Sequence, residues 1–227
     1  MTDPNMVGTL DSEYANARET RKSLKYRLWR RTFEVMFAIN KYAVMQKKNI
    51  IDLGTADGRM LQKIYEKYPE SSCIGIEYNY ELVQLAHKNF PELKILQGDI
   101  QMIDYPDNFF DVAIATAVIE HVLDPAKAVS EAKRILKPGG VLILSSPDPF
   151  WEYIATKAGL LDNEQHNEVM SLKQLSDLIE KGGFKVLEAY KFMLSPIGIP
   201  FEFIIEGYLR RLKLGCLMAN QLLIGKA

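Results

Sequence analysis

Three acidic residues stand at the ends of short apolar runs in this chain. Asp52 closes the run NIID, Glu77 closes CIGIE, and Asp99 comes two residues after LKILQ. A carboxylate at the end of a strand can accept hydrogen bonds from both hydroxyls of a ribose. The spacing therefore predicts a nucleoside-binding edge, with Glu77 at the ribose, Asp99 at an exocyclic amine and Ile100 packed against the base.

A glycine turn follows the first of these acids in the stretch DLGTADG, which contains Gly54 and Gly58. Glycine allows the backbone to bend sharply, and N–H groups at a helix start can bind a ligand. A turn that only reverses the chain would need the same glycines, so the signal is weak alone. A dinucleotide site would use three glycines spaced G-x-G-x-x-G. This chain has G-x-x-x-G, and Asp52 and Asp99 have no role in such a site.

Short apolar runs alternate with longer amphipathic patterns along most of the chain. This alternation is typical of parallel strands joined by helices that cover both faces of a sheet. We predict an α/β fold: a doubly wound, mostly parallel, seven-stranded Rossmann-like sheet with an antiparallel last strand. The expected strands are residues 49–53, 73–77, 93–97, 111–116, 141–146, 184–190 and 217–226.

Two segments interrupt the alternation. Residues 1–47 should form an N-terminal helical cap on a Rossmann-like domain that spans residues 48–227. Within that domain we expect a lid insertion at about 147–170 and a C-terminal decoration at about 192–216. The cap and the lid should lie over the carboxyl ends of the strands, where open α/β sheets bind ligands. Ser171 is expected to cap the next helix.

The chain resembles the class I S-adenosylmethionine-dependent methyltransferases, in the broad group called methyltransferase type 11 or ubiquinone-biosynthesis-like. The resemblance covers roughly residues 48–190 and rests on the glycine turn, Glu77 and Gly98-Asp99-Ile100. Its most specific part is the run FFDVAIATAVIEHVLDPAKAVSEAKRILKPGGVLILSSP, in which Phe110-Asp111, Glu120-His121 and Leu136-Lys137-Pro138-Gly139-Gly140 fall at the family spacing.

The resemblance implies S-adenosylmethionine as cofactor and S-adenosylhomocysteine as its product. It also implies that Asp52 anchors the turn near the methionine amino group and that the backbone of 115–117 faces the methionine part. Family members commonly have glycine where this chain has Ala56, and alanine adopts a positive φ only at a cost. The expected cofactor-binding residues are Asp52, Gly54, Thr55, Ala56, Gly58, Glu77, Tyr78, Asp99, Ile100, Ala115, Thr116 and Ala117.

Methyl transfer from a sulfonium requires mainly alignment and exclusion of water. We therefore predict in-line displacement onto a small, partly apolar acceptor, with O- or C-methylation favoured. Such an acceptor would gain from a general base, for which His121 and His166 are the candidates. His121 could instead position a helix start, and His166 could have a capping role before Ser171. The alternatives are a cofactor-binding subunit or sensor without turnover and, ranked lower, an NAD-binding oxidoreductase.

The charges are almost balanced, with 28 basic and 29 acidic residues, which argues against nucleic-acid binding. Ten of the basic residues but only two acidic ones fall between Arg18 and Lys48. We expect these charges to face solvent. The alternatives are an anionic acceptor group facing Arg27, Arg30 or Arg31, and peripheral contact with an anionic membrane. Two cysteines without metal-ligand spacing, and the lack of a secretory signal, suggest a cytoplasmic protein without a metal.

Overall fold

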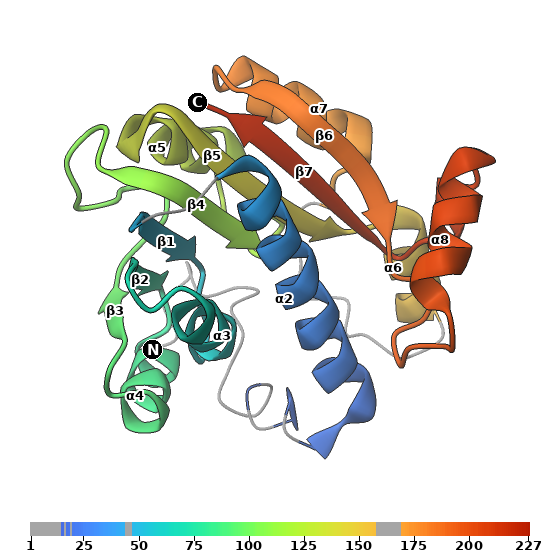
Figure 1. Ribbon diagram of the computed structural model, residues 1–227, viewed down its shortest axis with the longest axis horizontal. Helices are drawn as coiled ribbons and strands as arrows, with labels where there is room; N and C mark the ends of the chain where they lie inside the picture. The colour runs from blue at the N-terminus through green and yellow to red at the C-terminus, as the bar shows by residue number, and fades with distance from the viewer. Residues whose placement is uncertain (1–14, 16, 19, 44–46, 158–168) are drawn as a thin grey trace.

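The computed structural model describes residues 15, 17–18, 20–43, 47–157 and 169–227. Its centre is a seven-stranded sheet in the order β3-β2-β1-β4-β5-β7-β6 (Figure 1). β7 runs antiparallel to both of its neighbours, and the other neighbouring strands pair in parallel. The predicted fold class is confirmed. The strands are β1 (Asn49–Leu53), β2 (Ser72–Glu77), β3 (Lys94–Gln97), β4 (Phe110–Thr116), β5 (Leu136–Pro147), β6 (Lys185–Phe192) and β7 (Asn220–Lys226).

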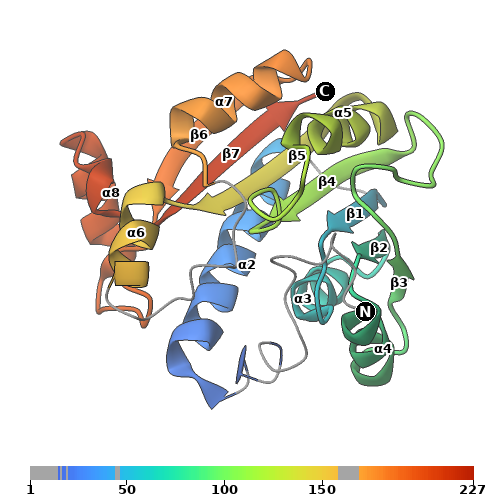
Figure 2. The ribbon, with the colours of Figure 1, turned by 180° about the vertical axis from the view of Figure 1, so that it is seen from behind.

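Helices cover both faces of the sheet, and each face has its own apolar core. One core joins the sheet to α2, α3 and α4, and the other joins it to α5 and α7 (Figures 1 and 2). The helices are α2 (Lys22–Tyr42), α3 (Arg59–Lys67), α4 (Tyr80–Asn89), α5 (Pro125–Ile135), α6 (Pro149–Lys157), α7 (Leu172–Lys181), α8 (Glu202–Arg211) and the 3-10 helix η2 (Gly215–Leu217).

Local signals place most element boundaries. Ser171 caps α7 as expected: its Oγ accepts from the N–H of Gln174, and its own N–H donates to the Gln174 side chain. β5 begins five residues before the expected strand, because Leu136 pairs with Phe110 across a bulge. β7 begins after the expected residue 217, because residues 215–217 form η2.

Helix α2 begins at the carboxyl edge of the sheet, but only its first half lies there. Its second half packs on the sheet face through Val35, Ala38 and Ile39, none of which is exposed. The expectation that the basic residues face solvent is wrong for Arg30 and Arg31, which are 0% and 7% exposed. Arg30 pairs with Glu34 on α2 and with Glu206 on α8, and Arg31 donates to Asn220 on β7.

Candidate functional site

The turn after β1 is left-handed at three positions: Gly54, Ala56 and Gly58 have φ values of 74°, 51° and 79°. The N–H of Gly54 donates to the carbonyl of Ile76 at 2.8 Å, which ties the turn to β2. A Cβ on Gly54 would lie 2.4 Å from Val118, so space as well as conformation requires glycine there. Ala56 adopts the costly positive φ, and its N–H donates to Glu77 at 2.8 Å.

Two acids at this edge are buried, but their hydrogen bonding differs. Glu77 accepts from the N–H groups of Ala56 and Asn79, at 2.8 and 2.9 Å. Asp52 is 2% exposed, and neither its buried Oδ1 nor the nearby Thr55 hydroxyl makes a hydrogen bond of good geometry among the described residues. Burial raises the pKa of Asp52 to about 7, although the Thr55 hydroxyl partly opposes this rise. Asp52 is therefore the acid at this edge whose environment leaves an acceptor for a ligand.

The third acid is less constrained. Asp99 is half-buried and accepts from the N–H of Gln101 at 2.8 Å. Ile100, next to it, is packed in the apolar core. At the end of β4, the Thr116 hydroxyl donates to the sulfur of Met60 at 3.7 Å, and Ala117 has a φ of 49°. Asp99, Ile100, Thr116 and Ala117 follow the ends of β3 and β4 and so lie at the same edge of the sheet as Asp52 and Glu77.

A pocket at this edge brings together part of the predicted set, namely Asp52, Gly54, Thr55, Ala56 and Thr116. The other predicted residues do not line it: Gly58, Glu77, Tyr78, Asp99, Ile100, Ala115 and Ala117. Its remaining walls are Met60 and a group that precedes or belongs to α2, namely Arg18, Leu24, Arg27, Leu28 and Arg31.

The pocket has a free volume of about 20 Å³, which is room for roughly one water molecule. A ligand of nucleoside size therefore requires the covering side chains of α2 to move aside.

The sequence did not reveal one ion cluster beside the turn. Asp57 is fully buried and accepts from Arg18 at 3.0 Å and from Arg59 at 2.7 Å. The pairing holds the segment before α2 against the turn that leads into α3. Its signal in the sequence was an acid inside the glycine turn, together with a basic stretch upstream.

A second, wider groove of about 520 Å³ lies between α2 and α3. It shares Arg18 and Leu28 with the pocket, so the two spaces adjoin. Its walls are mainly apolar, and its charged residues are mostly basic. The other lining residues are Lys25, Trp29, Thr32, Phe33, Met36, Arg59, Gln62, Lys63, Glu66 and Phe90.

The structure describes only one of the two candidate bases. His121 lies in the turn after β4, where its backbone N–H donates to the backbone carbonyl of Val118 at 3.0 Å. His166 lies outside the described residues. Both therefore stay predictions. Among the described residues, no three His, Cys, Asp or Glu side chains gather as metal ligands.

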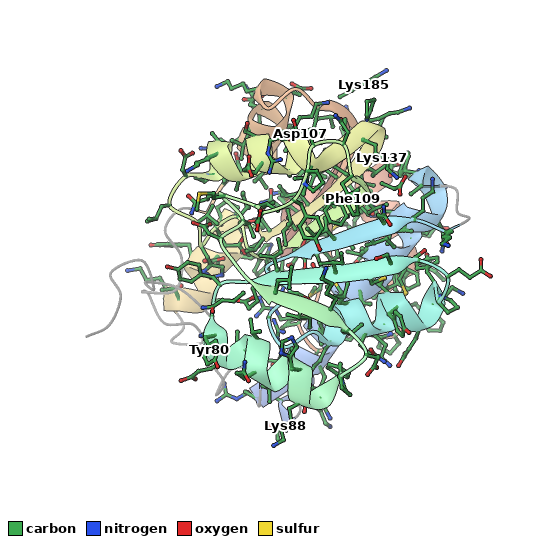
Figure 3. All side chains as sticks on the ribbon, turned by 90° about the vertical axis from the view of Figure 1, so that its left-hand side faces the viewer. Tyr80, Lys88, Asp107, Phe109, Lys137 and Lys185 are labelled. Carbon is green, nitrogen blue, oxygen red and sulfur yellow. The ribbon has the colours of Figure 1, made fainter. Side chains whose placement is uncertain are left out.

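Asp111, although it belongs to the run that carries the resemblance, lies far from this edge. It accepts from the Asn49 N–H and from Lys137, both at 2.9 Å. In Figure 3, Lys137 and Tyr80 at the start of α4 lie toward opposite ends of the strands. Asp111 is therefore structural: it holds the amino ends of β1, β4 and β5 together.

Comparison with known proteins identifies the family. The family model of the methyltransferase domain matches residues 20–189. The chain belongs to the class I S-adenosylmethionine-dependent methyltransferases. S-adenosylmethionine is the cofactor of this family, and the charged residues of the pocket fit the methionine end of that molecule once the side chains of α2 have moved aside. The orphaned oxygen of Asp52 can accept from its ammonium group, and the neighbouring arginines can bind its carboxylate.

Three curated relatives illustrate the similarity. A Mycolicibacterium smegmatis protein named "Probable S-adenosylmethionine-dependent methyltransferase" is 33% identical over 50% of this chain and 43% of its own. The trans-aconitate 2-methyltransferase of an Acidovorax species is 32% identical over 44% and 39%. The malonyl-[acyl-carrier protein] O-methyltransferase of Halalkalibacterium halodurans is 25% identical over 71% and 58%. The matches thus span less than two thirds of each relative.

Solved structures share the fold. One is a chain of the complex between the Trm112 methyltransferase activator and a methyltransferase of Haloferax volcanii, with a TM-score of 0.71, 19% identity and coverage of 96% and 99%. Another is a methyltransferase of Thermotoga maritima that depends on S-adenosylmethionine, with a TM-score of 0.67, 22% identity and coverage of 94% of both chains.

Proposed function

We propose that this protein transfers the methyl group of S-adenosylmethionine to an oxygen or carbon atom of a small, partly apolar acceptor that carries a carboxylate or a similar anion. The observation that carries the proposal is the pocket that the unsatisfied Oδ1 of Asp52 shares with Arg27 and Arg31 of α2. A buried acceptor without a partner is costly unless a ligand supplies the donor.

The cofactor brings a methyl group already activated on a sulfonium, so the chain has mainly to bind and orient it. We assign Asp52 to the methionine ammonium, Glu77 to the ribose hydroxyls, and Asp99 with Ile100 to the adenine. Glu77 already accepts one N–H on each oxygen, and a carboxylate oxygen has a second lone pair for a hydroxyl. Because an adjacent cation favours an ionised carboxylate, the ammonium would lower the pKa of Asp52 from about 7.

The arginines support an anionic acceptor. The methionine part of the cofactor has one carboxylate, which one guanidinium suffices to bind. Arg31 is held by the side-chain oxygen of Asn220 at 3.3 Å, and Arg27 lies one helical turn earlier on the same side of α2. Arg27 thus provides a further cation for the acceptor. The trans-aconitate and malonyl acceptors named for two relatives are both carboxylates.

The groove between α2 and α3 supports the apolar part of the proposed acceptor. It adjoins the pocket through Leu28 and offers Trp29, Phe33 and Phe90 as walls. α2 lies between the pocket and solvent, so the same helix that binds the anion would exclude water during the transfer. His121 and His166 remain the candidate bases for an acceptor that has to lose a proton.

The test is a methyl-transfer assay with labelled S-adenosylmethionine on small carboxylic acids and their uncharged amides. We expect transfer to some acids and none to the matching amides. Arg27→Gln should raise the KM for the acid about tenfold or more and leave cofactor affinity unchanged. The matched control, Lys22→Gln at an exposed position of α2, should behave as wild type.

Two other outcomes would replace the proposal. Tight cofactor binding without transfer to any acid, amide, alcohol or carbon acid would favour a silent subunit or sensor. Binding of NAD with no affinity for S-adenosylhomocysteine would favour an oxidoreductase. Equal transfer to acids and amides would refute the anionic acceptor but keep the methyltransferase.

A further inference from the structure

Aromatic side chains of two helices far apart in the sequence meet on the outside of the molecule. Trp29 and Phe33 of α2 each contact Phe203 of α8, with ring centroids 6.1 and 4.9 Å apart. These three rings are 51%, 42% and 39% exposed. The exposed apolar group continues along both helices. We call it the α2–α8 surface: Trp29, Phe33 and Phe37, together with Phe201, Phe203, Ile204 and Tyr208.

In the segments that form this surface, the acidic side chains are buried and the exposed charges are basic. The carboxylates of Glu34 on α2 and of Glu202 and Glu206 on α8 are all buried. Glu206 accepts from Arg30 at 2.5 Å and from the N–H of Met193 at 2.6 Å.

The other two buried acids are also satisfied inside the protein. Glu202 accepts from the N–H of Leu194 at 2.7 Å, and Glu34 accepts from Tyr190 at 2.6 Å. No other acid occurs in residues 21–42 or 192–217. The exposed charges of these segments are therefore all basic: Arg21, Lys22, Lys25, Lys41, Arg211 and Lys213, of which Lys41 pairs with Glu188 on β6.

The turn before α8 holds an aromatic residue outward in a strained conformation. Phe201 is 76% exposed and has a φ of 61°, a left-handed value that is rare for a bulky residue. The turn closes tightly on α2, since a Cβ on Gly198 would lie 2.6 Å from the ring of Tyr26. A strained residue persists where the surroundings impose it, and such residues cluster at functional sites. Here the left-handed backbone at Phe201 leaves its side chain exposed to solvent.

We infer that the α2–α8 surface docks this protein onto an anionic membrane surface. Exposed aromatic and aliphatic side chains beside a fringe of Lys and Arg are the chemistry that an interface of hydrocarbon and anionic headgroups recognises. None of the described helices is long and apolar enough to cross a membrane. Trp29 and Phe33 also line the groove between α2 and α3, but the inference does not depend on the proposed methyl transfer.

The test is co-sedimentation of the full chain with phosphatidylcholine vesicles, with and without phosphatidylserine. We expect binding that requires phosphatidylserine and weakens at high salt. The apolar variant Phe201→Ser/Ile204→Ser/Tyr208→Ser and the charge variant Arg211→Glu/Lys213→Glu should each lose about tenfold or more in affinity. Circular dichroism should show both variants folded.

The controls make changes of the same kind, apolar to serine and basic to glutamate, at exposed positions elsewhere. Met102→Ser removes an apolar side chain that is 74% exposed, and Lys88→Glu/Lys185→Glu reverses two exposed bases outside α2 and residues 192–217 (Figure 3). Both controls should bind as wild type does. Failure of the wild type to bind phosphatidylserine vesicles would overturn the inference. Equal losses in variants and controls would do so too, as would self-association through this surface that leaves no vesicle binding.

Discussion

Two regions of this protein bury carboxylates, and they do so in opposite ways. At the strand ends, Asp52 is buried with an oxygen that has no partner among the described residues. Between α2 and α8, Glu206 is fully buried, but it is paired with Arg30 and with a backbone N–H. Burial is therefore not what marks a binding site. The unsatisfied oxygen of Asp52 is available to a ligand, whereas the carboxylate of Glu206 holds α8 against α2 and the end of β6.

The largest expected effect on stability concerns the buried ion pair of Arg30 and Glu206 between α2 and α8. Glu206→Ala would leave the buried guanidinium of Arg30 without one of its two carboxylates. Breaking a buried ion pair from one side costs about 3–5 kcal/mol, so urea unfolding should show a loss of that size. Glu66→Ala, which removes an exposed partner of Lys63, is the control and should change stability little. Similar losses in both variants would contradict a structural role for Glu206.

The next effect concerns the glycine turn. Gly54→Ala should destabilise the protein by about 2 kcal/mol, because the residue has a φ of 74° and its new Cβ would meet Val118. Adding Val118→Ala should recover part of that loss in a double-mutant cycle. Gly207→Ala on α8 has open space around the new methyl and should not destabilise. An unchanged loss in the double variant would show that the clash is unimportant.

A smaller effect on stability, this time a gain, is expected when Asp52 is replaced. Its pKa in the folded protein is about 7, raised by burial above the ordinary value of 3.8. The folded state then binds the proton more tightly than the unfolded state, so this group makes stability fall as pH rises from about 4 to about 7. Without ligand, Asp52→Asn should therefore be more stable than wild type at pH 8, by about 1 kcal/mol or more, and equally stable near pH 4. Urea unfolding at the two pH values measures this, and a less stable Asn variant at pH 8 would contradict it.

The fold and the strand-end residues could be predicted because their signals are local. The alternation of apolar runs and helical patterns predicted the sheet, and Ser171 predicted the start of α7. Arg30 and Arg31 could not be placed. Arg30 pairs with Glu34 on its own helix, but its second carboxylate, Glu206, and the acceptor of Arg31, Asn220, lie 176 and 189 residues away. Nothing in the order of residues near α2 reveals which of its charges face inward.

The turn shows the same limit on a smaller scale. The alanine at position 56 argued against a positive φ there, yet Ala56 adopts one. Its N–H reaches Glu77, an acid 21 residues further on, and that hydrogen bond helps to hold the unfavourable conformation. The local cost of a positive φ at Ala56 is therefore offset by a hydrogen bond to a residue that is distant in the sequence.

The most direct test of the central claim is a calorimetric titration at pH 8 with S-adenosylhomocysteine and with its analogue in which hydrogen replaces the amino group. If the unsatisfied oxygen of Asp52 binds the ammonium, Asp52→Asn should weaken S-adenosylhomocysteine about tenfold or more and leave the analogue unchanged. Equal affinities of wild type and variant for S-adenosylhomocysteine, or equal losses for both ligands, would contradict the account.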